Sequence, residues 1–227
     1  MTSSSTTSAS TSGSPAASPA PLTAPVPLTA LALICSLKPS PAPSSSELMA
    51  SQILDELATH GVTGTSVRVV DYDVKPGVET DMGDGDQWPT LRDQLLAADI
   101  LVMVTPTWMG QASSIAHRVL ERLDAELSEM DAAGRPDLYD KVAVVGVVGN
   151  EDGAHHITAV LYQSLNDVGY TIPPQGGTYW NGEAMHTTDY NDLDETPENT
   201  ATATKGLASN AAHLARLLKG AAYPATS

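Results

Sequence analysis

The sequence has few basic residues and a single cysteine, and each shortage excludes a class of protein. Eleven Lys and Arg residues stand against 27 Asp and Glu residues, which gives a formal net charge of −16. Nucleic acid and anionic membrane surfaces would repel such a chain. Cys35 has no second cysteine to pair with, so the chain cannot form an internal disulfide, as is usual in a reducing cytoplasm. We therefore expect a cytoplasmic protein with neither nucleic acid nor membrane as a partner.

Long hydrophobic runs are also missing, since no window reaches the roughly 18 apolar residues that a membrane-spanning helix needs. Residues 1–27 are almost entirely Ser, Thr, Ala, Pro and Gly, and this composition cannot bury enough apolar surface to offset the entropy of ordering. The apolar run 28–35 is short and no Lys or Arg precedes it, so we do not expect a signal peptide. The predicted organisation is a disordered tail over 1–27, one domain over 28–220 and a short tail over 221–227.

Three nucleotide-binding and hydrolase motifs are absent as well. The sequence contains no G-x-x-x-x-G-K-[ST], which excludes a P-loop nucleoside triphosphatase. No G-x-G-x-x-G follows the first predicted strand, so the dinucleotide fingerprint of a Rossmann domain is missing. No G-x-S-x-G is present, which argues against an α/β-hydrolase. Among phosphate-containing ligands, a mononucleotide remains the best candidate.

Apolar segments of strand length alternate with segments of helical periodicity along the chain. Ser46 is a plausible N-cap of the first helix, and Gly61 is expected to end it. The alternation predicts a parallel sheet covered by helices on both faces, with the flavodoxin-like strand order 2-1-3-4-5 in a three-layer αβα fold. The predicted strands are 28–35, 66–72, 100–105, 141–149 and 171–180, and the predicted helices are 47–60, 88–99, 115–127, 157–168 and 198–219.

In this topology the loops after the first, third and fourth predicted strands meet at one edge of the sheet. The first, SLKPSPAPSSS (36–46), is rich in hydroxyl groups and ends at the start of a helix, whose free N–H groups suit a phosphate. The alternative is an ordinary capped loop stiffened by proline. The side chains that could donate to a phosphate are Ser36, Ser44, Ser45 and Ser46.

The second loop, PTWMGQAS (106–113), places apolar surface at the end of a buried strand. Pro106 and Gly110 shape the turn, and Thr107, Trp108 and Met109 offer a flat face against which a heteroaromatic ring could pack. The alternative is that Trp108 belongs to the core or to a dimer contact.

The third loop, GNEDGAHH (149–156), combines glycines with polar side chains. Gly149 and Gly153 allow close approach of the backbone to a ligand. His155 and His156 are adjacent on a predicted helix and point about 100° apart, which makes them a poor chelating pair. We therefore expect no metal site, and each histidine has the alternative role of an ordinary residue at a helix start.

Three stretches, 31–54, 97–124 and 145–170, together resemble the flavodoxin-like NAD(P)H-dependent FMN reductase and quinone reductase superfamily. The resemblance covers about residues 28–219. Its most specific part lies in 99–124, where an acidic residue, an apolar strand, T-P-x-x-x-G and an amphipathic helix follow one another. The lone Cys35, at the end of the first strand, is expected to be a small buried hydrophobe.

This resemblance implies a noncovalent FMN cofactor, hydride transfer from NAD(P)H through the flavin to a quinone, azo or other small acceptor, and a homodimer in contact through the helix at 111–130. The implied phosphate ligands are Ser36, Lys38, Ser44, Ser45 and Ser46. The implied neighbours of the isoalloxazine ring are Pro106, Thr107, Trp108, Met109 and Gly110. The residues implied to close the other side are Gly149, Asn150, Glu151, Asp152 and Gly153.

Two other functions remain open from the sequence. The acidic surface would suit a flavodoxin-type carrier of single electrons, which docks on its partner electrostatically. The first loop contains no glycine, its three prolines remove backbone donors and Lys38 is its only cation. These departures from the family pattern keep open a flavodoxin-fold protein that has lost its flavin.

The segment TYWNGEAMHTTDY (178–190) leads from the last predicted strand into a long polar loop. Our hypothesis is that this loop folds over the flavin crevice of the same or a partner subunit and shapes the acceptor pocket, with His155, Tyr179 and Trp180 as its candidate residues. The alternative is a surface loop docked by two aromatic side chains.

Overall fold

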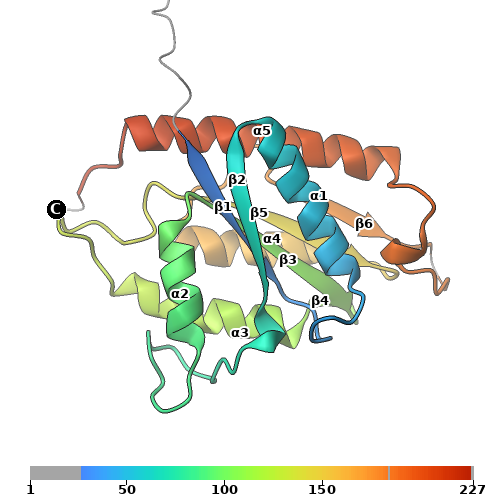
Figure 1. Ribbon diagram of the computed structural model, residues 1–227, viewed down its shortest axis with the longest axis horizontal. Coiled ribbons are helices and arrows are strands. Elements are labelled where there is room, and N and C mark those ends of the chain that lie inside the picture. Colours follow the sequence, from blue (N-terminus) through green and yellow to red (C-terminus); the bar gives the residue numbers. More distant parts are fainter. Residues whose placement is uncertain (1–26, 184, 226–227) are drawn as a thin grey trace, which may run out of the picture.

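The computed structural model describes residues 27–183 and 185–225, so the predicted disordered tail lies outside the described residues except for Pro27. The described chain alternates strands and helices (Figure 1). The strands are β1 (Leu28–Ile34), β2 (Val62–Arg68), β3 (Ile100–Trp108), β4 (Gln111–Ala112), β5 (Val142–Gly149) and β6 (Gly177–Asn181). The helices are α1 (Ser45–Thr59), α2 (Trp88–Ala97), α3 (Ser114–Leu123), α4 (Ala154–Asp167) and α5 (Glu198–Gly220), with short 3₁₀ turns at Val69–Asp71, Asp124–Leu127 and Tyr190–Asp192.

Five parallel strands form the sheet in the order β2-β1-β3-β5-β6. Leu33 pairs with Met103 on β3, and Met103 pairs in turn with Val145 on β5. The two-residue β4 pairs antiparallel with the end of β3 and lies off this path. The predicted flavodoxin-like order 2-1-3-4-5 is therefore confirmed, because the fourth and fifth predicted strands are β5 and β6.

Alternating side chains of the buried strands feed two separate cores. Leu31 and Leu33 of β1 point to the core that α2, α3 and α4 cover. Ala30, Ala32 and Ile34 point to the core that α1 and α5 cover. The strands are apolar on both faces because both faces are covered. None of the described helices is long and apolar enough to cross a membrane.

The predicted second strand, 66–72, is wrong in its bounds. β2 begins at Val62, directly after Gly61, and the chain turns into a 3₁₀ helix at Val69. β2 is an edge strand whose central residues are exposed. The small polar residues at these positions form no apolar run. The apolar pair Val69 and Val70 therefore shifted the predicted strand toward the C-terminus.

Helix α1 starts two residues earlier than predicted. Ser44, not Ser46, is the N-cap, and its hydroxyl accepts a hydrogen bond of 3.3 Å from the N–H of Glu47. Gly61, with φ +72°, lies just beyond the helix end, as expected. The early start places Ser45 and Ser46 in the first turn of the helix.

The structure has no continuous helix over the predicted range 115–127, or over the wider range 111–130 that was expected to form the dimer contact. Residues 111–112 belong to β4, α3 ends at Leu123 and a 3₁₀ turn covers Asp124–Leu127. The fifth predicted strand is also shorter than 171–180. Its first half holds Pro173 and Pro174 and only a single bridge, between Thr171 and Val142, before β6 starts at Gly177.

Candidate functional site

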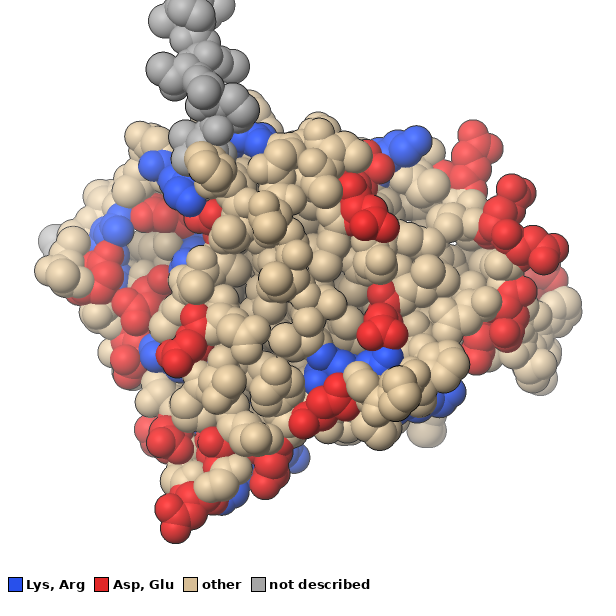
Figure 2. Space-filling view, in the orientation of Figure 1, with Lys and Arg blue, Asp and Glu red and all other residues tan. Residues whose placement is uncertain are grey.

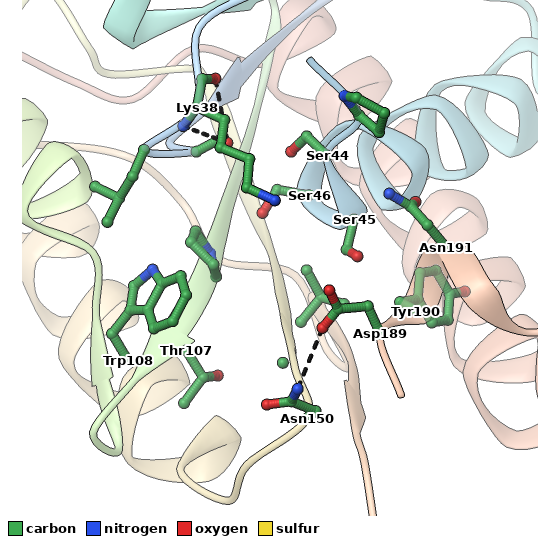
Figure 3. Close-up of a pocket in the computed structure, with 16 residues that line it drawn as sticks. Lys38, Ser44, Ser45, Ser46, Thr107, Trp108, Asn150, Asp189, Tyr190 and Asn191 are labelled. Carbon is green, nitrogen blue, oxygen red and sulfur yellow. Dashed lines mark hydrogen bonds between the residues drawn. The ribbon is translucent and has the colours of Figure 1, made fainter. Parts of the chain in front are cut away.

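Four chain segments enclose a cavity of about 140 Å³ at the carboxyl ends of β1, β3 and β5 (Figure 3). We call it the strand-end pocket. Three of the segments are the predicted loops after β1, β3 and β5, which the topology does bring together. The fourth, residues 189–191, was not predicted. A volume of 140 Å³ is smaller than the roughly 300–1,000 Å³ of pockets that engulf a ligand, so a nucleotide would be enclosed only in part.

The β1–α1 loop supplies the polar end of the pocket. All five predicted phosphate residues, Ser36, Lys38, Ser44, Ser45 and Ser46, line it. The Ser36 hydroxyl accepts a hydrogen bond of 3.1 Å from the N–H of Lys38, which fixes the start of the loop. Figure 3 shows the Lys38 side chain extending toward the three serines at the start of α1. Hydroxyl groups, a helix N-terminus and an ammonium group therefore converge at this end.

The β3–β4 hairpin supplies the apolar end. Trp108 pairs with Gln111 across a turn of only two residues, Met109 and Gly110, whose φ angles are +51° and +73°. Positive φ at both positions is the geometry of a type I′ turn, which matches the twist of a hairpin. Pro106, Thr107 and Trp108 line the pocket, and about half of the Trp108 surface is exposed. Met109 is 91% exposed at the tip, and neither it nor Gly110 lines the pocket.

The loop between β5 and α4 divides between two roles. Gly149 and Asn150 line the pocket. Glu151 instead accepts a hydrogen bond of 2.8 Å from the N–H of Met109, and Gly153 packs so closely that an added Cβ would lie 2.8 Å from the Gly110 backbone. Glu151, Asp152 and Gly153 do not line the pocket. Glu151 and Gly153 hold the hairpin in place from behind.

The three predicted acceptor-pocket residues do not line the strand-end pocket. His155 and Tyr179 stack edge to face on one another, with ring centroids 5.1 Å apart. Trp180 packs on Tyr190, with ring centroids 5.4 Å apart. His156 contacts Gln111 of the hairpin at 3.1 Å. Trp180 and His156 therefore support neighbouring walls from outside the pocket, whereas His155 and Tyr179 pack on each other.

Sequence reasoning missed the wall formed by Asp189, Tyr190 and Asn191. The Asp189 carboxylate accepts a hydrogen bond of 3.2 Å from the Asn150 amide, which closes one side of the pocket (Figure 3). The Tyr190 hydroxyl donates to the Gln52 amide oxygen of α1 at 2.8 Å, which anchors the segment. Burial raises the pKa of Tyr190, although hydrogen bonds with Thr196 and Gln52 offset part of this effect. The end of the loop after β6, at residues 189–191, therefore forms one wall of the strand-end pocket.

Two buried hydroxyl groups mark where the strands end. Ser113, the N-cap of α3, donates to the Cys35 carbonyl at 2.6 Å and accepts from the N–H of Ala116 at 3.1 Å. Sequence reasoning did not single it out. The Thr107 hydroxyl of the pocket wall has no hydrogen-bond partner within residues 27–183 and 185–225. An unpartnered buried hydroxyl is costly, and a ligand is one source of the missing bond.

Cys35 lies beside this edge, but its thiol is not expected to be reactive. The side chain is fully buried, and burial raises the pKa of its thiol. The reactive form of a cysteine is the thiolate, so this side chain remains a small buried hydrophobe, as the sequence predicted.

The family model for NADPH-dependent FMN reductase matches residues 28–185. The chain belongs to this family. The match confirms the resemblance inferred from the residues around β1, β3 and β5, and it ends just before the Asp189–Asn191 wall. Members of the family are flavin oxidoreductases, which sets the chemistry that the strand-end pocket is compared with.

Two curated relatives differ in how much of their length this chain spans. The chain is 36% identical over 202 residues to the divalent metal cation transporter MntH of Mycobacterium bovis, but these residues span only 30% of that protein. It is 31% identical over 207 residues to 8-demethyl-8-aminoriboflavin-5'-phosphate synthase of Streptomyces davaonensis, and here the match covers 86% of this chain and 80% of the relative.

Among solved structures, the chain is similar to RosB with the bound intermediate 8-demethyl-8-formylriboflavin-5'-phosphate. The TM-score is 0.78 at 31% identity, and the match covers 86% of this chain and 82% of that one. That relative therefore holds a flavin phosphate on the same fold.

Proposed function

We propose that this protein is a flavin-dependent oxidoreductase that holds FMN in the strand-end pocket and passes electrons from NAD(P)H to a quinone-like or other small acceptor. The observation that carries the proposal is the polarity of the pocket. One end gathers Lys38, three serine hydroxyls and the start of α1, and the other end presents the face of Trp108. A ligand with a phosphate at one end and an aromatic ring at the other fits this arrangement.

The phosphate end would be held by the N–H groups at the start of α1, the hydroxyls of Ser45 and Ser46, and the Lys38 ammonium. On the face shown in Figure 2, acidic side chains lie mostly toward the margins and basic ones form a few small groups. In a chain of net charge −16, a local cation matters for any anionic ligand, because the surrounding field opposes its approach. Lys38 is therefore the main electrostatic contribution of the loop to phosphate binding.

The ring end would be held by Trp108, with the Thr107 hydroxyl as a hydrogen-bond donor to a polar atom of the ring. The Thr107 hydroxyl lacks a partner among the described residues, which supports a ligand that accepts from it. When bound, the flavin would supply hydride transfer between a reduced nicotinamide and an acceptor. The protein then has to position the flavin, and partial enclosure leaves one edge of it accessible to both reaction partners.

A second candidate function treats the flavin as the substrate. It is favoured by the 31% identity to 8-demethyl-8-aminoriboflavin-5'-phosphate synthase over most of both chains, because the product that this enzyme is named for is a modified flavin phosphate. The same pocket would serve either function. What distinguishes them is whether the flavin leaves the protein unchanged.

The deciding experiment is a visible absorption spectrum of the purified protein, taken before and after incubation with FMN and desalting. We expect a retained flavin spectrum that NADH or NADPH bleaches in the absence of air and that an added quinone restores. Mass spectrometry of the flavin released after turnover should give unaltered FMN.

Each other outcome changes the proposal in a defined way. A released flavin of altered mass would favour the synthase-like function. A retained flavin that neither nicotinamide reduces, but that dithionite reduces one electron at a time, would favour an electron carrier. Absence of any flavin binding would overturn the proposal and favour a family member that has lost its cofactor.

The proposal includes a homodimer. Leu127 and Met130, which follow α3 within the predicted contact segment, are each about half exposed. Large exposed apolar side chains within one short segment would suit a protein contact. Sedimentation equilibrium should give twice the chain mass, and Leu127→Glu should shift the equilibrium toward the monomer. A wild-type monomer at micromolar concentration would remove this part of the proposal.

A further inference from the structure

Arg68, the last residue of β2, is buried behind the β1–α1 loop and is not part of the strand-end pocket lining. Its guanidinium donates to the carbonyl oxygens of Lys38 at 3.1 Å and Ala42 at 2.8 Å. It also donates to a carboxylate oxygen of Glu47 at 2.6 Å. One side chain therefore joins both ends of the loop to the first turn of α1.

The loop depends on such outside donors because of its composition. Pro39, Pro41 and Pro43 have no N–H groups, so the loop can form few hydrogen bonds within itself. Asp71 holds the middle of the loop, accepting from the N–H of Ser40 at 2.9 Å and from its hydroxyl at 2.6 Å. Arg68 and Asp71 together fix residues 38, 40 and 42, and the carbonyl groups of Lys38 and Ala42 face the guanidinium.

Charge gives Arg68 a second role. Glu47 lies in the first turn of α1, three residues after the N-cap, and about half of its side chain is exposed. A carboxylate there favours the helix but opposes an anion bound at the same helix end. The ion pair with Arg68 offsets this negative charge, so the start of α1 keeps its attraction for a phosphate.

We infer that Arg68 is a positioning residue that makes the β1–α1 loop selective for the phosphate of a flavin nucleotide, by setting the loop's shape and by neutralising Glu47. The inference rests on the proposed function, since it assumes that the strand-end pocket holds a flavin. It adds a residue outside the pocket on which discrimination between FMN and riboflavin depends. Riboflavin lacks only the phosphate, so the two ligands isolate this contribution.

The experiment compares dissociation constants for FMN and riboflavin, measured by flavin fluorescence for the full chain. We expect wild type to prefer FMN. Arg68→Met should weaken FMN binding by about 10- to 100-fold, the scale of hydrogen bonds to charged groups, and should leave riboflavin binding unchanged. Arg118→Met is the matched control. Arg118 belongs to α3 and donates to the carbonyl of Val74, in the loop before α2, at 2.7 Å. It therefore holds a different loop and does not line the pocket.

Two further variants separate the roles and guard against misfolding. Arg68→Met/Glu47→Gln removes the unpaired carboxylate, so it should recover part of the lost FMN affinity, and the recovered part should shrink with added salt. Arg68→Lys keeps the charge but not the planar fork. If Arg68→Met fails to fold by circular dichroism, Arg68→Lys should still show a smaller loss confined to FMN.

The outcomes are distinct. A folded Arg68 variant that loses FMN and riboflavin affinity equally, or loses neither, overturns the inference while flavin binding stands. A wild type that binds both flavins equally well does the same. A wild type that binds neither flavin overturns the proposed function, and the inference falls with it.

Discussion

The β1–α1 loop and the β3–β4 hairpin form facing walls of the strand-end pocket, and different forces hold them. The loop depends on side chains of β2 and of the 3₁₀ turn that follows it, because Arg68 and Asp71 form hydrogen bonds with this proline-rich segment. The hairpin depends on backbone geometry, with two positive-φ residues in its turn and Gly153 packed against Gly110. Hydrogen bonds from charged side chains therefore fix the polar wall, whereas turn geometry and close packing, with one hydrogen bond to Glu151, fix the apolar wall. Substitutions should affect the two walls in different ways.

Gly153→Ala is the substitution expected to break the hairpin wall most strongly. Gly153 has φ +139°, and an added Cβ would lie 2.8 Å from both Cα and the carbonyl oxygen of Gly110. Backbone strain and overpacking together should lower the free energy of unfolding by about 3 kcal/mol or more. Denaturant unfolding followed by circular dichroism measures this loss.

Gly134→Ala is the matched control for that prediction. Gly134 also has positive φ, +75°, but no atom in the described part of the chain lies within 4 Å of its added Cβ. It should lose only the conformational cost of about 1–2 kcal/mol. Equal losses at the two glycines would show that the contact between the β5–α4 loop and the hairpin contributes nothing to stability.

Ser113→Ala tests how much the contact between the two walls contributes to stability. Ser113 caps α3 and also donates to the Cys35 carbonyl at the end of β1, so its loss should cost about 2 kcal/mol. Ser44→Ala removes the corresponding cap of α1, whose hydroxyl forms no bond to a strand among the residues that the structure describes, and should cost about 1 kcal/mol. Thermal unfolding of the two variants side by side measures the difference. A Ser44→Ala loss as large as that of Ser113→Ala would contradict a special role for Ser113.

These differences explain which parts of the molecule could be predicted from sequence. Strands buried on both faces are continuous apolar runs, so the bounds of β1 and β5 were predicted to within one residue. The start of β3 was also correct, but the strand continues to Trp108, three residues beyond its predicted end and into the segment predicted as a loop. The edge strand β2 carries exposed Thr63, Gly64 and Thr65 and was misplaced because an edge strand needs no apolar run. Helix ends with clear signals, such as Gly61, were found as well.

The site was predictable where the residues that would bind one part of the ligand lie close together in the sequence. Hydroxyls before a helix predicted the four serines of the polar wall, the resemblance added Lys38, and all five residues line the pocket. The turn at Met109–Gly110 lacks the usual Asn-Gly or Asp-Gly, so a two-residue hairpin was not anticipated. The segment that carries Asp189 is anchored by Tyr190, which bonds to Gln52, 138 residues earlier in the chain. A long-range contact of this kind leaves no local pattern in the sequence.

The two walls should also differ in which part of a flavin they recognise. Lys38→Met should weaken FMN binding about 10-fold and leave riboflavin binding unchanged, because only the phosphate meets the ammonium. Trp108→Ala should weaken binding of both flavins by a similar factor, because the indole faces the ring. Fluorescence titration with each flavin gives the four ratios. A Trp108→Ala protein that loses affinity for FMN alone would place the phosphate, not the ring, at the hairpin.

The smallest expected effect lies at the tip of the hairpin, where Met109 occupies a turn position that favours asparagine. Met109 adopts φ +51° and is 91% exposed, so it bears the strain of the left-handed region without packing in return. Met109→Asn would create the Asn-Gly pair that type I′ turns favour, and its N–H could still donate to Glu151. We expect the free energy of unfolding to rise by about 0.5–1 kcal/mol. Met109→Ala also removes the exposed side chain but stays strained, so it should give no gain. If both variants gained equally, exposure of the methionine rather than backbone geometry would be what limits this wall.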